Sequence, residues 1–185
     1  MVMKAVSFVV ILFTTIFIYF LFKPLPIVEP TIFEVHKGYG LNQVIDELRK
    51  QDLIERPMLL KFYGKISRKS QNILAGEYLI LNNDTAIDLI NKIRLGSIHY
   101  RQIRLKEGST FKEILSLFEN SPYIKKDQSI KDVSVIHSYL NLNRKSLEGL
   151  FHPDTYYYKK GDFYLDILAR AYSKHGHIID EIWSS

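Results

Sequence analysis

The 185-residue sequence contains no cysteine, which excludes a disulfide framework, a thiol nucleophile and a Cys-ligated metal. It also has no phosphate-cradling glycine loop and no arguable Ser-His-Asp spacing. Histidines are scattered. His175 and His177 are two positions apart and do not share a helical face, which favours a solvated helix end over a metal site. The sequence therefore predicts no metal and no other cofactor.

A strong excess of one charge is also missing. The formal net charge is +5, and removing Lys4 and Lys23, which flank an apolar run, leaves +3 for the rest. Acidic residues are interspersed with the basic ones, so the sequence predicts no nucleic-acid partner. A mild basic bias suits a protein near anionic lipid or an anionic polymer equally well.

One long hydrophobic run is present. Residues 5–22 read AVSFVVILFTTIFIYFLF, without charge or proline. At about 1.5 Å per residue they would span roughly 27 Å, close to the hydrocarbon thickness of a bilayer. The alternatives are a cleaved signal peptide, although no small-x-small cleavage site follows, and a buried core helix. We expect an uncleaved transmembrane anchor over residues 5–22, a cytoplasmic tail over 1–4, and a soluble part that faces away from the cytoplasm.

A repeated strand-turn-helix pattern comes after a stiff proline-containing spacer over residues 23–30. Alternating residues followed by a helical apolar stripe occur near residues 31–50, 77–93 and 102–118, with Asp84 and Ser109 as expected helix caps. We therefore expect an α+β fold, with helices packed over short strands across residues 31–120.

The first of these units resembles a LysM-type peptidoglycan-binding module, which has a strand, a Lys-Gly turn and a helix. Its turn reads Lys37-Gly38-Tyr39-Gly40, where the common pattern has Lys-Gly-Asp-Thr. The resemblance implies a glycan-binding turn at Lys37, Gly38 and Tyr39. The alternative is a domain that serves only packing and spacing.

The segment from residue 146 reads SLEGLFHPDTYYY. Pro153 fixes a bend, Asp154 can cap the residues after it, and three tyrosines supply flat surfaces that suit sugar rings. With the preceding parts, this segment resembles the YceG-like (MltG) family of endolytic murein transglycosylases. The motifs that carry the resemblance are Arg56-Pro57, Leu74-Ala75-Gly76-Glu77-Tyr78, Glu107-Gly108, Glu148-Gly149 and Pro153-Asp154-Thr155-Tyr156.

The resemblance implies non-hydrolytic cleavage of peptidoglycan glycan strands, giving 1,6-anhydro-N-acetylmuramic acid ends during cell-wall assembly. It implies an inner-membrane, periplasm-facing protein with cell-wall synthesis proteins as partners. The catalytic glutamate of the family lies in a Glu-x-Glu segment that does not occur here. We therefore expect residues 121–185 to be the start of a truncated transglycosylase domain, without a catalytic residue in this chain.

Four residues are candidates for the substrate side of a cleft: Glu148, Asp154, Thr155 and Tyr156. Glu148 and Asp154 could form an acid/base pair, since glycoside cleavage often uses two carboxylates. The competing interpretation is structural, with Asp154 as a turn cap and Glu148 as a hydrogen-bond partner. The competing function is a non-catalytic, membrane-tethered protein that binds peptidoglycan or acts as a scaffold.

Overall fold

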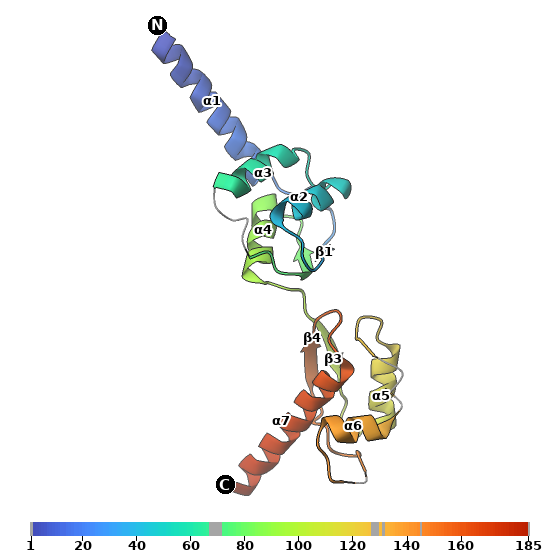
Figure 1. Cartoon of the computed structure of the whole chain (residues 1–185). Helices are drawn as coiled ribbons and strands as arrows, with labels where there is room; N and C mark the ends of the chain where they lie inside the picture. The colour runs from blue at the N-terminus through green and yellow to red at the C-terminus, as the bar shows by residue number, and fades with distance from the viewer. Residues whose placement is uncertain (1, 67–71, 127–129, 131, 145, 185) are drawn as a thin grey trace. The chain divides into compact units, whose positions relative to one another are not determined.

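The computed structural model describes residues 2–66, 72–126, 130, 132–144 and 146–184. It is an α+β protein that divides into two compact units, Met1–His99 and Tyr100–Ser185 (Figure 1). Each unit has its own buried apolar cluster. The third predicted strand-turn-helix pattern belongs to the second unit, since the division falls before it and not after residue 120.

The first unit is built on one two-stranded antiparallel sheet. Strands β1 (Thr31–Val35) and β2 (Gly76–Ile80) pair from Thr31↔Ile80 to Val35↔Gly76. Phe33 and Tyr78 lie opposite each other and are almost fully buried. The helices of this unit are α1 (Val2–Phe22), α2 (Leu41–Lys50), α3 (Pro57–Ile66) and α4 (Ala86–Leu95). Apolar stripes of α2 and α4 fill the core beside the sheet.

The N-cap of α4 lies one residue later than the sequence predicted. Thr85, and not Asp84, is the N-cap, and its hydroxyl accepts a hydrogen bond from the Asp88 N–H. The Asp88 carboxylate accepts in return from the Thr85 N–H, which completes a capping box. Asp84 instead accepts from the Leu81 N–H at 2.7 Å and forms an ion pair with Lys92.

The predicted transmembrane anchor at residues 5–22 is contradicted. Within the part of the chain that the structure describes, no helix combines the length and apolar character needed to cross a membrane. The end of α1 is used for packing instead. Leu21 is buried, and the ring of Phe17 meets that of Phe62 edge-on with centroids 6.0 Å apart. The predicted single-pass inner-membrane location is contradicted by the same finding.

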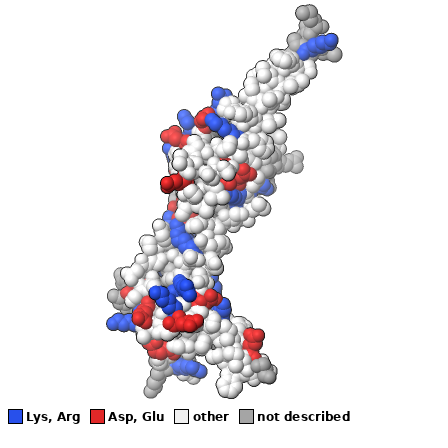
Figure 2. Space-filling view, turned by 180° about the vertical axis from the view of Figure 1, so that it is seen from behind, with Lys and Arg blue, Asp and Glu red and all other residues white. Residues whose placement is uncertain are grey.

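Apolar side chains elsewhere on α1 are exposed, among them Phe8 and Phe13. Figure 2 shows no charged side chain along the middle of this helix. Over the faces visible there, basic and acidic side chains are intermixed on both units. The sequence expectation of a diffuse charge distribution agrees with this view.

The second unit is built on another antiparallel pair. Strand β3 (Arg101–Arg104) pairs with β4 (Thr155–Tyr158), from Arg101↔Tyr158 to Arg104↔Thr155. The helices are α5 (Phe111–Asn120), α6 (Val133–Tyr139) and α7 (Tyr164–Ser184). Phe118 of α5 and Tyr164 of α7 are fully buried in the same cluster. This cluster therefore joins residues near 111 to residues near 164 in one core.

The buried residues of helix α7 all lie in its first half. They are Tyr164, Leu165, Ile167, Leu168 and Ala171. In the second half Ile182 and Trp183 are exposed, Trp183 by 85%. The helix predicted from Asp162 to about Trp183 is confirmed to within two residues at its start.

Candidate functional site

A groove open to solvent lies at one end of the β3–β4 pair. Because the strands are antiparallel, the end of β3 and the start of β4 come together at Arg104↔Thr155. The residues just after β3 and just before β4 complete the walls. The lining residues are Arg104, Leu105, Lys106, Glu107, Pro153, Asp154 and Thr155.

Backbone contacts fix the shape of this groove. The Leu105 N–H donates to the Asp154 carbonyl at 2.9 Å, and the Leu105 side chain is buried. The chain then turns through Gly108, whose φ of +73° lies in the left-handed region that glycine favours. Helix α5 begins after its N-cap Thr110, one residue beyond the predicted cap Ser109. Lys106 and Glu107 are therefore held on a short exposed turn between a strand and a helix.

Asp154 is an ionised carboxylate at the edge of the groove. Its Oδ1 accepts from the Thr155 N–H at 2.7 Å, and its Oδ2 pairs with Lys174 Nζ of α7. These two donors, the Lys174 side chain first, hold the pKa of Asp154 below its usual range. Asp154 therefore carries a negative charge near neutral pH and has no proton to donate.

Tyr156 faces the core and not the groove. It is 6% exposed, and its hydroxyl donates to the His152 carbonyl at 2.7 Å. Burial, together with the nearby Asp154 charge, raises the pKa of Tyr156 to about 12. Its neighbour Thr155 is half-buried and lies on the groove wall. Of the predicted cleft residues, Asp154 and Thr155 are thus brought together at the groove.

Glu148 is placed elsewhere in the second unit. Its Oε2 accepts a hydrogen bond from the Phe111 N–H at 2.8 Å, at the first residue of α5. A carboxylate there satisfies a free N–H group of the first helical turn and suits the positive end of the helix dipole. Glu148 and Asp154 are therefore each held by structural partners, and Glu148 does not line the groove.

The predicted glycan-binding turn lies between β1 and α2 in the first unit. Gly38 has a φ of +85°, and the Tyr39 N–H donates to the His36 carbonyl at 3.2 Å. Lys37 is exposed, whereas Tyr39 is half-buried, packs against the core and meets the His36 ring edge-on. The turn leaves Lys37 accessible to a ligand and uses Tyr39 mainly for packing.

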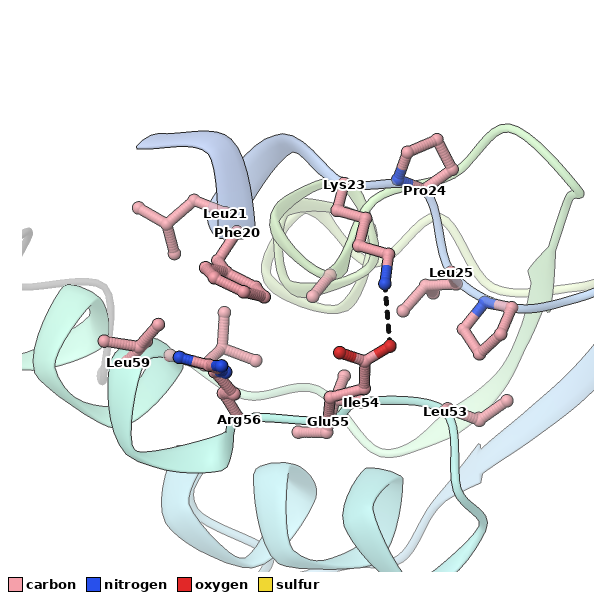
Figure 3. Close-up of a pocket in the computed structure, with 13 residues that line it drawn as sticks. Phe20, Leu21, Lys23, Pro24, Leu25, Leu53, Ile54, Glu55, Arg56 and Leu59 are labelled. Carbon is pink, nitrogen blue, oxygen red and sulfur yellow. Dashed lines mark hydrogen bonds and ion pairs between the residues drawn. The ribbon is translucent and has the colours of Figure 1, made fainter. Parts of the chain in front are cut away.

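A second, mostly apolar pocket lies where the end of α1 meets the rest of the first unit (Figure 3). Lys23 Nζ and Glu55 Oε1 are 2.7 Å apart, and the Arg56 guanidinium lies 4.1 Å from the centroid of the Phe20 ring. These charged groups connect the end of α1 to the chain that leads into α3, so we assign this pocket to packing. Among the described residues, no group of three or more His, Asp or Glu side chains could hold a metal.

Sequence reasoning did not identify Arg104, Lys106, Glu107 and Lys174 as site residues. Glu107 was noticed only as part of the Glu107-Gly108 motif. Lys174 lies 20 positions after Asp154, and no local pattern pairs a helical lysine with a residue before a strand. Helical periodicity places Lys174 on α7, but only the packing of α7 beside β4 brings the two charges together.

Comparison with known proteins identifies the family of this chain. A crystal structure of a YceG-like protein from Listeria monocytogenes is similar over 84% of this chain, with 20% identity and a TM-score of 0.41. This chain spans 57% of the length of that protein. No curated protein matches the sequence. The model of the YceG-like family matches residues 33–185, which cover most of both units. The chain belongs to the YceG-like family.

Proposed function

We propose that this protein acts on the glycan strands of peptidoglycan, as a lytic transglycosylase or as its strand-binding part, in cell-wall assembly. The support is family membership over residues 33–185, together with a polar groove formed by the Pro153-Asp154-Thr155 motif. The groove presents guanidinium, ammonium, hydroxyl and carboxylate groups. Such groups match the hydroxyl and amide groups of a glycan strand, which both donate and accept hydrogen bonds.

Lytic transglycosylation breaks one glycosidic C–O bond without water. A general acid protonates the leaving oxygen, and the C6 hydroxyl of the same N-acetylmuramic acid attacks its C1 and loses a proton. In the described part of the chain, Asp154 is ionised and Glu148 is bound at a helix start, so neither suits the role of acid. We therefore assign strand binding and orientation to this groove.

Within the groove, Arg104 and Lys106 donate hydrogen bonds to sugar and lactyl oxygens, and the Thr155 hydroxyl can donate or accept. The Asp154 carboxylate, fixed by Lys174, accepts from sugar hydroxyls. These groups come from both walls of the groove, the chain after β3 and the chain before β4, and together they would hold one strand.

The second candidate function is non-catalytic binding of peptidoglycan. It is favoured by a specific observation, that both carboxylates of the motif are held by structural partners. Lys37 on the exposed turn between β1 and α2 would then provide an additional contact with the glycan.

The test incubates the purified chain with peptidoglycan sacculi and measures two quantities. Sedimentation measures binding, and mass spectrometry measures newly formed 1,6-anhydro ends. Binding with new anhydro ends supports a transglycosylase, and binding without them supports the non-catalytic function. Absence of binding would reject both.

A pair of variants locates the binding to the groove. Lys106→Ala removes a donor from the groove wall, whereas Lys112→Ala removes a lysine on α5 that is also exposed but is not among the lining residues. We expect Lys106→Ala to lower the sedimented fraction and Lys112→Ala to leave it unchanged. Equal effects would mean that binding depends on overall charge and not on this groove.

A further inference from the structure

The β3–β4 pair has one face in the core and one face exposed. Ile103, Tyr156 and Tyr158 point into the core of the second unit. Because successive side chains of a strand alternate, the residues between them point the other way. The outward residues are Gln102, Arg104, Thr155 and Tyr157, of which Thr155 is half-buried and the others are exposed.

Tyr157 is the aromatic residue of this outer face. Its side chain is 57% exposed, and Gln102 lies directly opposite it on β3. Arg170 of α7 donates from Nη1 to the Tyr157 carbonyl at 2.7 Å, which fixes the strand at this point. The face thus presents a phenol ring beside a carboxamide, with a guanidinium from Arg170 along its side.

This outer face is continuous with the groove. Arg104 and Thr155 line the groove and are also paired in the ribbon, two positions along the strands from Gln102 and Tyr157. Four residue pairs extend over about 13 Å of ribbon. A bound molecule that enters the groove would therefore reach Tyr157 only if it is longer than one sugar ring.

The geometry points to a second subsite on the outer face of the β3–β4 pair, in which Tyr157 and Gln102 bind a glycan strand that continues out of the groove. The Tyr157 ring packs on the apolar face of a sugar, and the Gln102 carboxamide donates to and accepts from its hydroxyl or acetamido groups. This inference rests on the proposed function, and it assigns to Tyr157 the selection of longer strands over short fragments.

The charge and composition of the face support a saccharide as its occupant. Its outward side chains are all polar or amphipathic, and they offer a flat ring together with hydrogen-bond donors and acceptors, which suit a sugar. Arg104 and Arg170 add positive charge, which complements the carboxylates of a peptidoglycan strand.

The experiment measures affinity of the whole chain for soluble, peptide-free glycan oligomers of increasing length by calorimetry. We expect the wild-type affinity to rise with length until the groove and the outer face are both filled. Tyr157→Ala is expected to weaken binding of the longer oligomers about tenfold and to leave the shortest one unaffected. Gln102→Ala should weaken binding of the longer oligomers in the same way. Tyr157→Phe, which keeps the aromatic ring, should bind them as the wild type does.

Phe62→Ala is the matched control, since Phe62 is 56% exposed and belongs to α3 of the first unit. It should not change the length dependence, and thermal unfolding checks that each variant is folded. Wild-type binding that Tyr157→Ala leaves unchanged at every length would overturn the subsite but keep the proposed function. Absence of wild-type binding to any oligomer would overturn both.

Discussion

Asp154 carries a fixed negative charge at the groove because Lys174 and the Thr155 N–H both donate to its carboxylate. Both donors favour the charged form, and the pKa of Asp154 is lowered accordingly. A carboxylate in this state accepts hydrogen bonds but holds no proton near neutral pH. Asp154 can therefore orient a sugar but cannot act as the acid of the reaction.

Replacing Lys174 tests this assignment. In Lys174→Met we expect the pKa of Asp154 to rise toward its usual value, which NMR titration of the carboxyl carbon measures. A lowered folded-state pKa stabilises the protein above the unfolded-state value, about 3.9, and this stability is lost as the pH falls through the folded-state pKa. The variant should thus be less stable than wild type at neutral pH, and the difference should shrink in acid.

Lys112→Met, on the exposed side of α5, is the control and should leave the titration of Asp154 unchanged. An unaltered pKa of Asp154 in Lys174→Met would contradict the pairing.

Glu148 belongs to the same motif but is held at the start of α5. Glu148→Ala leaves the Phe111 N–H without its acceptor, and we expect a loss of about 1 kcal/mol in the free energy of unfolding. Glu148→Gln keeps an acceptor oxygen and should lose less. Urea unfolding measures both, and sacculus binding should be retained by Glu148→Gln. Loss of binding in a fully stable Glu148→Gln would show instead that the carboxylate contacts the glycan.

At the scale of elements, α4 and α5 start where a side chain satisfies one of the first free N–H groups. Helices α4 and α5 both have a threonine N-cap with an acidic residue three positions later, Thr85 with Asp88 and Thr110 with Glu113. In each case the pKa of the acidic residue is lowered by hydrogen bonds from the threonine. The reciprocal pair, and not a single polar residue, sets the first turn.

Thr85→Ala removes the hydroxyl that caps α4, and Thr85 is more buried than Thr110, the cap of α5. We expect a loss of about 1 kcal/mol in the free energy of unfolding of the first unit, measured by urea unfolding. The pKa of Asp88 should rise, because the Thr85 side chain is the first cause of its lowering. Ser116→Ala, inside α5, removes a hydroxyl bonded only within its own helix turn and should cost little. A Thr85→Ala protein as stable as wild type would contradict the capping role.

At the scale of the whole molecule, two buried clusters divide the chain. The cluster of the second unit joins α5, α6 and α7 to the β3–β4 pair. A core substitution in any of these elements should therefore destabilise the whole unit. The cluster of the first unit contains none of the same residues. We therefore expect a substitution in the core of one unit to destabilise that unit and to leave the stability of the other unit unchanged.

Phe118→Ala tests this division, because Phe118 is fully buried against the second unit's core. We expect the second unit to lose about 3–5 kcal/mol. Hydrogen exchange should show faster exchange in α5, α7 and β4, while amides of α2 and α4 keep their protection. The mirror substitution Leu89→Ala in α4 should have the reverse effect. A uniform loss of protection in both units would mean that they unfold as one.

Residue patterns along the chain determined the strand-turn-helix elements, the family and the location of the Pro153-Asp154-Thr155 segment, since these depend on neighbours within a few positions. The tertiary structure decided the rest. The sequence could not show that the end of the apolar run packs against the rest of the first unit, nor that Glu148 reaches an amide 37 positions away and Asp154 a lysine 20 positions away. Such contacts are set by how helices pack against strands, and local periodicity contains no information about which distant residue that packing brings near.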